Sequence, residues 1–209
     1  MQEVKVFCVN WGDKYSPEYV YKLENAVKKN LSLPHTFTVY TDNPTYYDNS
    51  IEVKHDLEGW WNKLLVFENT GQCLYLDLDI IIQNPIDNLV RDSFHIIHPY
   101  WKNPEFAKIL EDRPDIGTAF ANSSVMSWTD ERYILEHFLD DPEYYIFKYI
   151  GDDRYLHHEH EYQTYEDGLI YSYRNNNFQI KEDYAVALFH DEPKMTDCLD
   201  HDIVKRYWI

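Results

Sequence analysis

Hydrophobic and polar residues alternate along the first part of the chain in a pattern that predicts strands and helices in turn. Runs of β-branched and aromatic residues predict strands at residues 3–10, 35–41, 51–54 and 73–82. Two helices are expected between these strands, at residues 17–31 and 61–69. This alternation indicates an α/β domain with a mostly parallel sheet, whose ligand site is expected beyond the carboxyl ends of the strands.

The second half of the chain has a less regular pattern. Strands are expected at residues 94–98, 119–128, 169–173 and 184–190, and helices at residues 130–139 and 200–208. Residues 152–167 are polar and rich in His, Glu and Asp, which predicts a loop. Because no repeat or linker interrupts the chain, we expect one α/β domain with a central, mostly parallel mixed sheet flanked by helices.

The charge balance narrows the range of partners. The chain of 209 residues has 19 basic and 37 acidic residues and a net charge of −18, so it repels phosphate backbones and nucleic acid is not an expected partner. A phosphorylated substrate would need a local counter-charge, for which a divalent cation is the obvious candidate. No stretch approaches the roughly 18 apolar residues of a membrane span, and the N-terminus lacks a signal-peptide pattern. Three dispersed cysteines without a Cys-x-x-Cys pair favour a reducing, cytoplasmic setting.

The clearest chemical signal is a pair of aspartates inside an apolar run. If residues 73–82 form one strand, Asp77 and Asp79 point to the same side, because side chains two apart share a face. Buried carboxylates are costly unless they are paired or bind a metal, and carboxylate oxygens suit Mg²⁺ or Mn²⁺. A half-exposed strand with one polar face would also carry two such aspartates, although Tyr75 and Ile81 would then face solvent, which fits poorly.

The chain resembles glycosyltransferase family 8 and related GT-A enzymes over nearly its whole length, through short segments that occur in the family's order. These segments are residues 10–15 (NWGDKY), 39–42 (VYTD), 59–64 (GWWNKL), 73–82 (CLYLDLDIII), 122–126 (NSSVM), 151–153 (GDD) and 189–194 (FHDEPK). The resemblance implies one GT-A domain over residues 1–209. Its nucleotide-binding half would be residues 1–90 and its sugar and acceptor half residues 91–209.

The resemblance also implies an activity. The chain would use Mn²⁺ or Mg²⁺, held by Asp77, Asp79 and His190, to transfer a hexose from a UDP-sugar with retention of anomeric configuration. UDP-glucose or UDP-galactose is the expected donor, and the acceptor would be an unidentified saccharide, lipid-linked sugar or protein. The metal would act as a Lewis acid on the departing diphosphate.

By the same resemblance, Asn10 and Tyr15 would face the base, and Asp42 would accept a hydrogen bond from uracil or ribose. Lys194 and Lys63 would contact the diphosphate or the sugar. The full set of expected donor-binding residues is Asn10, Trp11, Tyr15, Thr41, Asp42, Lys63, Asp77, Leu78, Asn122, Ser123 and Lys194. The expected catalytic residues are Asp152, which would contact hydroxyls of the transferred sugar, and Asp153, which would lie beneath the anomeric carbon.

Several residues depart from the family pattern. Asp153 replaces a Gln, Ser124 replaces a Gly, and Asp191 and Glu192 replace a small neutral pair ahead of Pro-Lys. A carboxylate at 153 would stabilise or attack an oxocarbenium-like centre, or be displaced and do neither. Two acids at 191 and 192 would repel a diphosphate unless they point away. The run at residues 157–160 (HHEH) suggests metal ligands, but a plain polar or acceptor-facing loop is the expected alternative.

Two other functions use parts of the same pattern. A nucleotidyltransferase or sugar-nucleotide hydrolase also uses paired carboxylates and a metal, but it should carry a Gly-rich or Arg-containing phosphate loop after the first strand, which residues 10–15 lack. A non-catalytic carbohydrate-binding protein would fit the aromatic content of 17%, but it would not need His190 and Lys194 near two aspartates.

Overall fold

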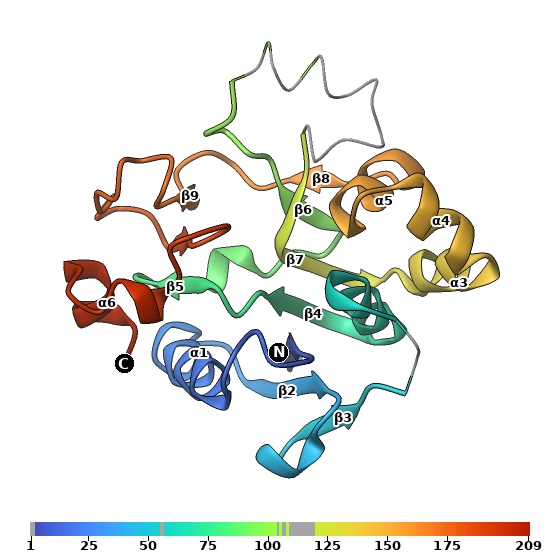
Figure 1. The fold of residues 1–209 in the computed structure, drawn as a ribbon, viewed down its shortest axis with the longest axis horizontal. Coiled ribbons are helices and arrows are strands. Elements are labelled where there is room, and N and C mark those ends of the chain that lie inside the picture. Colours follow the sequence, from blue (N-terminus) through green and yellow to red (C-terminus); the bar gives the residue numbers. More distant parts are fainter. Residues whose placement is uncertain (1–2, 55–56, 104, 106–107, 109–119) are drawn as a thin grey trace.

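The structure is a computed structural model that describes residues 3–54, 57–103, 105, 108 and 120–209 (Figure 1). Its main sheet has seven strands in the order β3-β2-β1-β4-β7-β6-β8. These strands are β1 Val4–Asn10, β2 His35–Thr41, β3 Ser50–Glu52, β4 Thr70–Leu76, β6 His95–Ile97, β7 Asn122–Asp130 and β8 Gln163–Thr164. Strand β7 runs antiparallel to its neighbours β4 and β6, whereas the other pairings are parallel. The expected mostly parallel mixed sheet is therefore confirmed.

Helices cover both faces of this sheet (Figure 1). Side chains of β1 and β4 point alternately to two apolar clusters, as strand geometry requires: Cys8 and Leu74 enter one, and Phe7 and Tyr75 the other. The first cluster contains side chains of α1 Pro17–Asn30 and α6 Asp202–Tyr207. The second contains side chains of the 3-10 helix η2 Gly59–Glu68 and of α3 Arg132–Asp140, α4 Pro142–Lys148 and α5 Asp152–Glu159.

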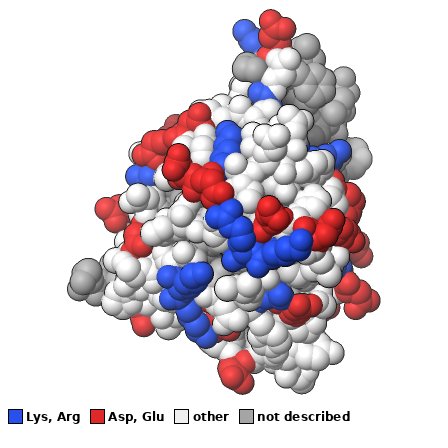
Figure 2. Space-filling model, turned by 90° about the vertical axis from the view of Figure 1, so that its left-hand side faces the viewer, with Lys and Arg blue, Asp and Glu red and all other residues white. Residues whose placement is uncertain are grey.

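A second, smaller sheet has the order β5-β10-β9 and is formed by β5 Ile80–Ile82, β9 Ile170–Ser172 and β10 Val186–Leu188. Helices α1 and α6 contact β5. On the α6 side of the molecule, Lys and Arg side chains gather near the middle of a face that also carries acidic groups (Figure 2). The excess negative charge is therefore not spread evenly over the surface.

Most of the predicted elements exist, with ends shifted by a few residues, but the single strand over residues 73–82 is wrong. The run divides into β4 and β5, which belong to different sheets. Asp77, Leu78 and Asp79 form the connection in which the chain crosses from one sheet to the other. The apolar run does not reveal the break, because both strands and Leu78 are buried. Strand alternation therefore cannot be the reason for any shared orientation of Asp77 and Asp79.

The loop predicted at residues 152–167 is also wrong, because helix α5 and strand β8 occupy much of it. The apolar side of α5 consists mainly of Tyr155 and Leu156, too few residues to show helical spacing. Within the same segment, His157 Nδ1 lies 2.6 Å from the Tyr162 hydroxyl, and the His158 ring stacks on Tyr149.

Other predicted elements differ from the structure in smaller ways. The segment predicted as a helix at 61–69 is the 3-10 helix η2, and helix α4 was not predicted. Residue 119, the first of the strand predicted at 119–128, lies outside the described residues. No helix within the described part of the chain has the length and apolar character to span a bilayer.

Candidate functional site

A cavity of about 1270 Å³ opens at the edge of the main sheet where β1 and β4 end and β7 begins. Because β7 is antiparallel to β4, its first residues lie at the same edge as the carboxyl ends of the parallel strands. The first turn of α5 and the segment after β10 also line it. This is the edge at which open α/β sheets bind ligands.

Most of the sequence-predicted site residues line this cavity, although they come from six separate segments. They are Trp11, Tyr15, Lys63, Asp77, Leu78, Asp79, Asn122, Ser123, Asp152, Asp153, His190 and Lys194. Asn10, Thr41 and Asp42 are not among the lining residues. Asn10 is buried and donates to the Tyr47 hydroxyl at 2.5 Å, Thr41 is buried, and Asp42 Oδ2 accepts from the Gly12 amide at 3.1 Å.

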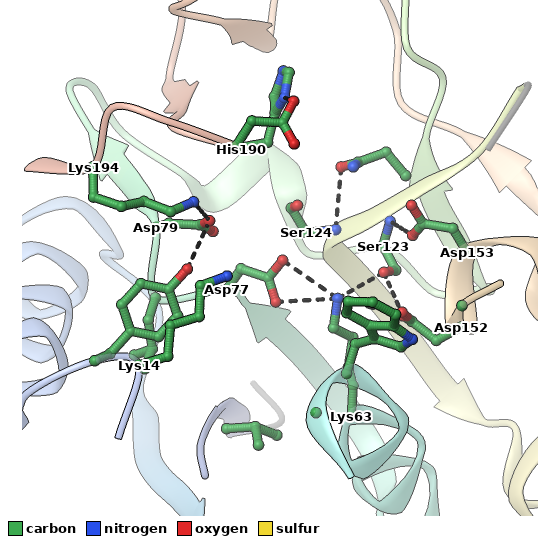
Figure 3. Close-up of a pocket in the computed structure, with 18 of the residues that line it drawn as sticks. Lys14, Lys63, Asp77, Asp79, Ser123, Ser124, Asp152, Asp153, His190 and Lys194 are labelled. Carbon is green, nitrogen blue, oxygen red and sulfur yellow. Dashed lines mark hydrogen bonds and ion pairs between the residues drawn. The ribbon is translucent and has the colours of Figure 1, made fainter. Parts of the chain in front are cut away.

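Lys63 connects the β4–β5 turn to helix α5 (Figure 3). Its Nζ lies 3.2 Å from Asp77 Oδ1 and 3.4 Å from Asp152 Oδ2, and it donates to Ser123 Oγ at 2.7 Å. Burial by itself would lower the pKa of this ammonium, but the charges of Asp152, Asp77 and Asp153 outweigh burial and raise it. The Tyr75 hydroxyl also donates to Asp77 Oδ1, at 2.6 Å. Lys63 therefore stays charged and holds Asp77 and Asp152 together.

Asp79 is paired with a different lysine, Lys194 (Figure 3). Lys194 Nζ donates to Asp79 Oδ2 at 2.6 Å and to the Phe189 carbonyl at 2.8 Å. The Tyr15 hydroxyl donates to the same Asp79 oxygen at 2.9 Å. Burial and the Asp79 charge raise the pKa of Tyr15, so the phenol keeps its proton and remains a donor.

His190 also lines the cavity, and both nitrogens of its ring lie close to other side chains. Its Nε2 is 2.7 Å from Ser172 Oγ and its Nδ1 is 3.3 Å from Asp191 Oδ2. Burial lowers the pKa of His190, which favours the neutral imidazole that can bind a metal. Within the described residues, no three His, Cys, Asp or Glu side chains are grouped closely enough to hold a metal ion. Asp77, Asp79 and His190 thus share a cavity, but each is bonded to a different protein group.

The two acids of α5 are both attached to Ser123. Asp152 Oδ2 accepts from Ser123 Oγ at 2.5 Å, and Asp153 Oδ1 accepts from the Ser123 amide at 2.6 Å. Burial raises the pKa of Asp152 to about 6 against the opposing charge of Lys63, and burial likewise raises the pKa of Asp153. Their place in the first turn of α5 is favourable, since the helix dipole stabilises carboxylates there.

Asp191, one of the residues that differ from the family pattern, is paired with an arginine in the structure. Arg174 Nη1 lies 3.1 Å from Asp191 Oδ2, so the guanidinium offsets the charge of this carboxylate. The cavity is also lined by Trp60, Trp101, Lys102 and Arg174, none of which was predicted as a site residue from sequence. Trp60 could have been predicted, because it lies in residues 59–64, a segment that resembles the family. Arg174 carries no sequence signal, since only the fold brings it beside Asp191.

Neither a family model nor a curated protein sequence matches this chain. Solved structures do match. A crystal structure of an active-site Gln-to-Glu variant of LgtC aligns with a TM-score of 0.66 at 12% identity, over 97% of this chain and 93% of that one. A crystal structure of the galactosyltransferase LgtC in complex with donor and acceptor sugar analogues aligns with a TM-score of 0.63 at 12% identity and the same coverage. At this identity the likeness establishes the architecture, and the chain shares the GT-A fold of LgtC over nearly its whole length.

Proposed function

We propose that this chain is a glycosyltransferase that moves a hexose from UDP-glucose or UDP-galactose to a saccharide, lipid-linked or protein acceptor, with retention of anomeric configuration. The observation that carries the proposal is the convergence of Lys63, Lys194 and the aspartates at 77, 79, 152 and 153 on one cavity at the ligand-binding edge of a GT-A fold. The structural neighbour that holds donor and acceptor sugar analogues is a galactosyltransferase with the same fold. Three free, buried cysteines fit the cytoplasmic setting that we propose for it.

Binding of a diphosphate in this cavity would depend on positive charge within the site itself. A chain with a net charge of −18 repels a sugar nucleotide at long range, so attraction must come from groups inside the site. Lys194 and Lys63 supply two ammonium groups, each less than a tenth exposed. Lys194, beside Asp79, would face the diphosphate, whereas Lys63 would act mainly by orienting Asp77 and Asp152.

A divalent cation fits the ligand types of this site. Two carboxylates and a neutral imidazole are a donor set suited to Mn²⁺ or Mg²⁺, and Asp77, Asp79 and His190 all line the cavity. In the structure, lysine ammonium groups balance both carboxylates, so an ion would share Asp77 with Lys63 and Asp79 with Lys194. When bound, the ion would supply Lewis-acid stabilisation of the leaving diphosphate.

The two acids of α5 would act on the transferred sugar. Asp152, held by Lys63 and Ser123, would accept hydrogen bonds from sugar hydroxyls. Asp153 would lie beneath the anomeric carbon, where its carboxylate would stabilise the positive charge that develops there. Attachment of both acids to Ser123 fixes their spacing before the donor arrives, which reduces the reorganisation needed in the transition state.

A thermal-shift experiment tests this proposal against a non-catalytic carbohydrate-binding function. UDP together with Mn²⁺ should raise the melting temperature of the chain more than either one alone, because ligands that bind only the folded state stabilise it. Stabilisation by free sugars but not by UDP with Mn²⁺ would contradict the proposal and indicate a carbohydrate-binding protein.

A further inference from the structure

The cavity extends beyond the groups proposed to hold the diphosphate. Its volume is about 1270 Å³, and its lining includes Trp60 and Ile150 as well as Asp79 and Lys194. Its polar groups form two sets (Figure 3): Asp79 with Lys194, and Ser123 with Asp152 and Asp153. If the diphosphate lies at the first set, the reacting end of the donor lies at the second, and a second substrate must enter beside Asp152 and Asp153.

An exposed tryptophan stands at that end of the cavity. Trp60 lines the cavity with 56% of its surface exposed. A methyl group on Gly151 would lie 3.2 Å from Trp60 Nε1, so the indole lies directly against the residue that precedes Asp152 and Asp153. Ile150, on the other side of Gly151, also lines the cavity and is 51% exposed. Trp60 and Ile150 thus form an apolar rim next to the two acids.

The backbone that carries Trp60 is firmly anchored. Trp61 is buried and stacks on Phe138, with ring centroids 5.3 Å apart and ring planes 11° apart. Asn62 is buried and donates to the Leu57 carbonyl at 2.9 Å, and Lys63 is fixed by its carboxylate partners. The indole of Trp60 is therefore exposed on a well-anchored backbone. Stacking of a ligand on it would require little additional ordering of the protein, so the entropic cost of binding would be small.

We propose that Trp60 is the platform of the acceptor subsite and that the acceptor is a neutral saccharide whose sugar ring lies on the indole. This proposal rests on the proposed glycosyltransferase function. A pyranose ring has an apolar face of C–H groups and a rim of hydroxyls, and a tryptophan offers a matching flat apolar surface. The neighbouring Asp152 and Asp153 can accept hydrogen bonds from hydroxyls. Together with Asp77 they outnumber Lys63 and Lys102, so the net negative charge at this end of the cavity disfavours anionic sugars. Stacking on Trp60 would present an acceptor hydroxyl to the donor sugar held by these acids.

Saturation-transfer NMR on the protein loaded with UDP and Mg²⁺ tests the proposal directly. The probes are neutral methyl glycosides of glucose, galactose, mannose and N-acetylglucosamine, with methyl glucuronide as the anionic comparison. At least one neutral glycoside should receive saturation most strongly at its ring C–H protons. Trp60→Ala should raise its Kd about tenfold or more, the scale expected when contact with several tens of Å² of apolar surface is lost. Trp60→Phe should keep part of the affinity.

The matched control is Phe147→Ala, because Phe147 is 91% exposed on α4 and is not among the residues that line the cavity. This variant should bind glycosides like the wild type. Equal glycoside affinity in Trp60→Ala and wild type would overturn the proposal, as would stronger binding of methyl glucuronide or no transfer to any neutral glycoside. Calorimetry of UDP on the same samples separates the two levels: failure of UDP to bind the wild type contradicts the glycosyltransferase function itself.

Discussion

Replacement of Lys63 by methionine tests the electrostatic core of the site. Lys63 is 7% exposed and is the ammonium group that bridges Asp77 and Asp152. Removal of one partner from a buried ion pair typically costs about 3–5 kcal/mol, because the other charge is left without compensation. Asp77 retains the Tyr75 hydrogen bond and its side chain is 21% exposed, so we expect the lower end, about 3 kcal/mol at pH 8.

The same variant should show a characteristic pH dependence. Burial raises the pKa of Asp152 to about 6 in the folded state, above the unfolded value of about 3.9. Stability is therefore lost as the pH rises from about 3.9 to about 6 and this carboxyl ionises, and loss of Lys63, which raises the folded pKa further, extends this window to higher pH. Protonation relieves the unpaired charge as the pH falls through that raised pKa. The loss of stability in Lys63→Met should thus be smaller at pH 5 than at pH 8.

Urea unfolding of the wild type and the variant at both pH values measures this effect. Lys14→Met serves as the control, since Lys14 also lines the cavity but is exposed, and surface changes usually stay within about 0.5 kcal/mol. A loss below about 1 kcal/mol for Lys63→Met at pH 8, or an equal loss at both pH values, would refute the reasoning.

Three further predictions concern turnover and binding. Because the pKa of Asp152 is raised to about 6, kcat/KM should fall as the pH drops below about 6 and this carboxylate is protonated; a pH–rate profile that stays flat to pH 5 would contradict its role. His190→Ala should weaken Mn²⁺-dependent UDP binding about tenfold or more, and unaltered affinity in calorimetry would remove His190 from the site. Asp153→Asn should lower kcat about 100-fold with nearly unchanged UDP-sugar affinity, since its carboxylate acts on charge that forms only in the transition state. A wild-type rate with a competent acceptor would show that Asp153 has no part in the reaction.

Local pattern was sufficient for the elements that build the sheet. Strands such as β1 and β2 and the helix α1 carry strong β-branched or helical spacing, and they were predicted within a residue or two of their ends. The pattern failed at the site itself. The connection at residues 77–79 continues a buried apolar run, so nothing in the sequence marks the change of sheet. Helix α5 buries Asp152 and Arg154 as well as Tyr155 and Leu156, so it lacks the apolar stripe by which helices are recognised.

The partners of the site residues could not be read from sequence either. Lys63 meets Asp152 and Lys194 meets Asp79 across long separations in the chain, and only tertiary structure brings these charges together. Asp191 was expected to disturb a diphosphate, and its pairing with Arg174 follows from the proximity of β9 and β10. Many of the residues that line the cavity were therefore predictable from sequence, whereas Trp101, Lys102 and Arg174, and the pairing between charged groups, were not.

The most direct measurement of the central claim is release of UDP from UDP-glucose and UDP-galactose by the purified chain, with and without Mn²⁺. The proposed function predicts Mn²⁺-dependent release from at least one of these donors, faster when a neutral saccharide acceptor is present. It also predicts loss of that release in Asp77→Asn and Asp79→Asn with the fold retained. If neither donor released UDP, or if release were unchanged in both variants, the result would contradict a metal-assisted glycosyltransferase.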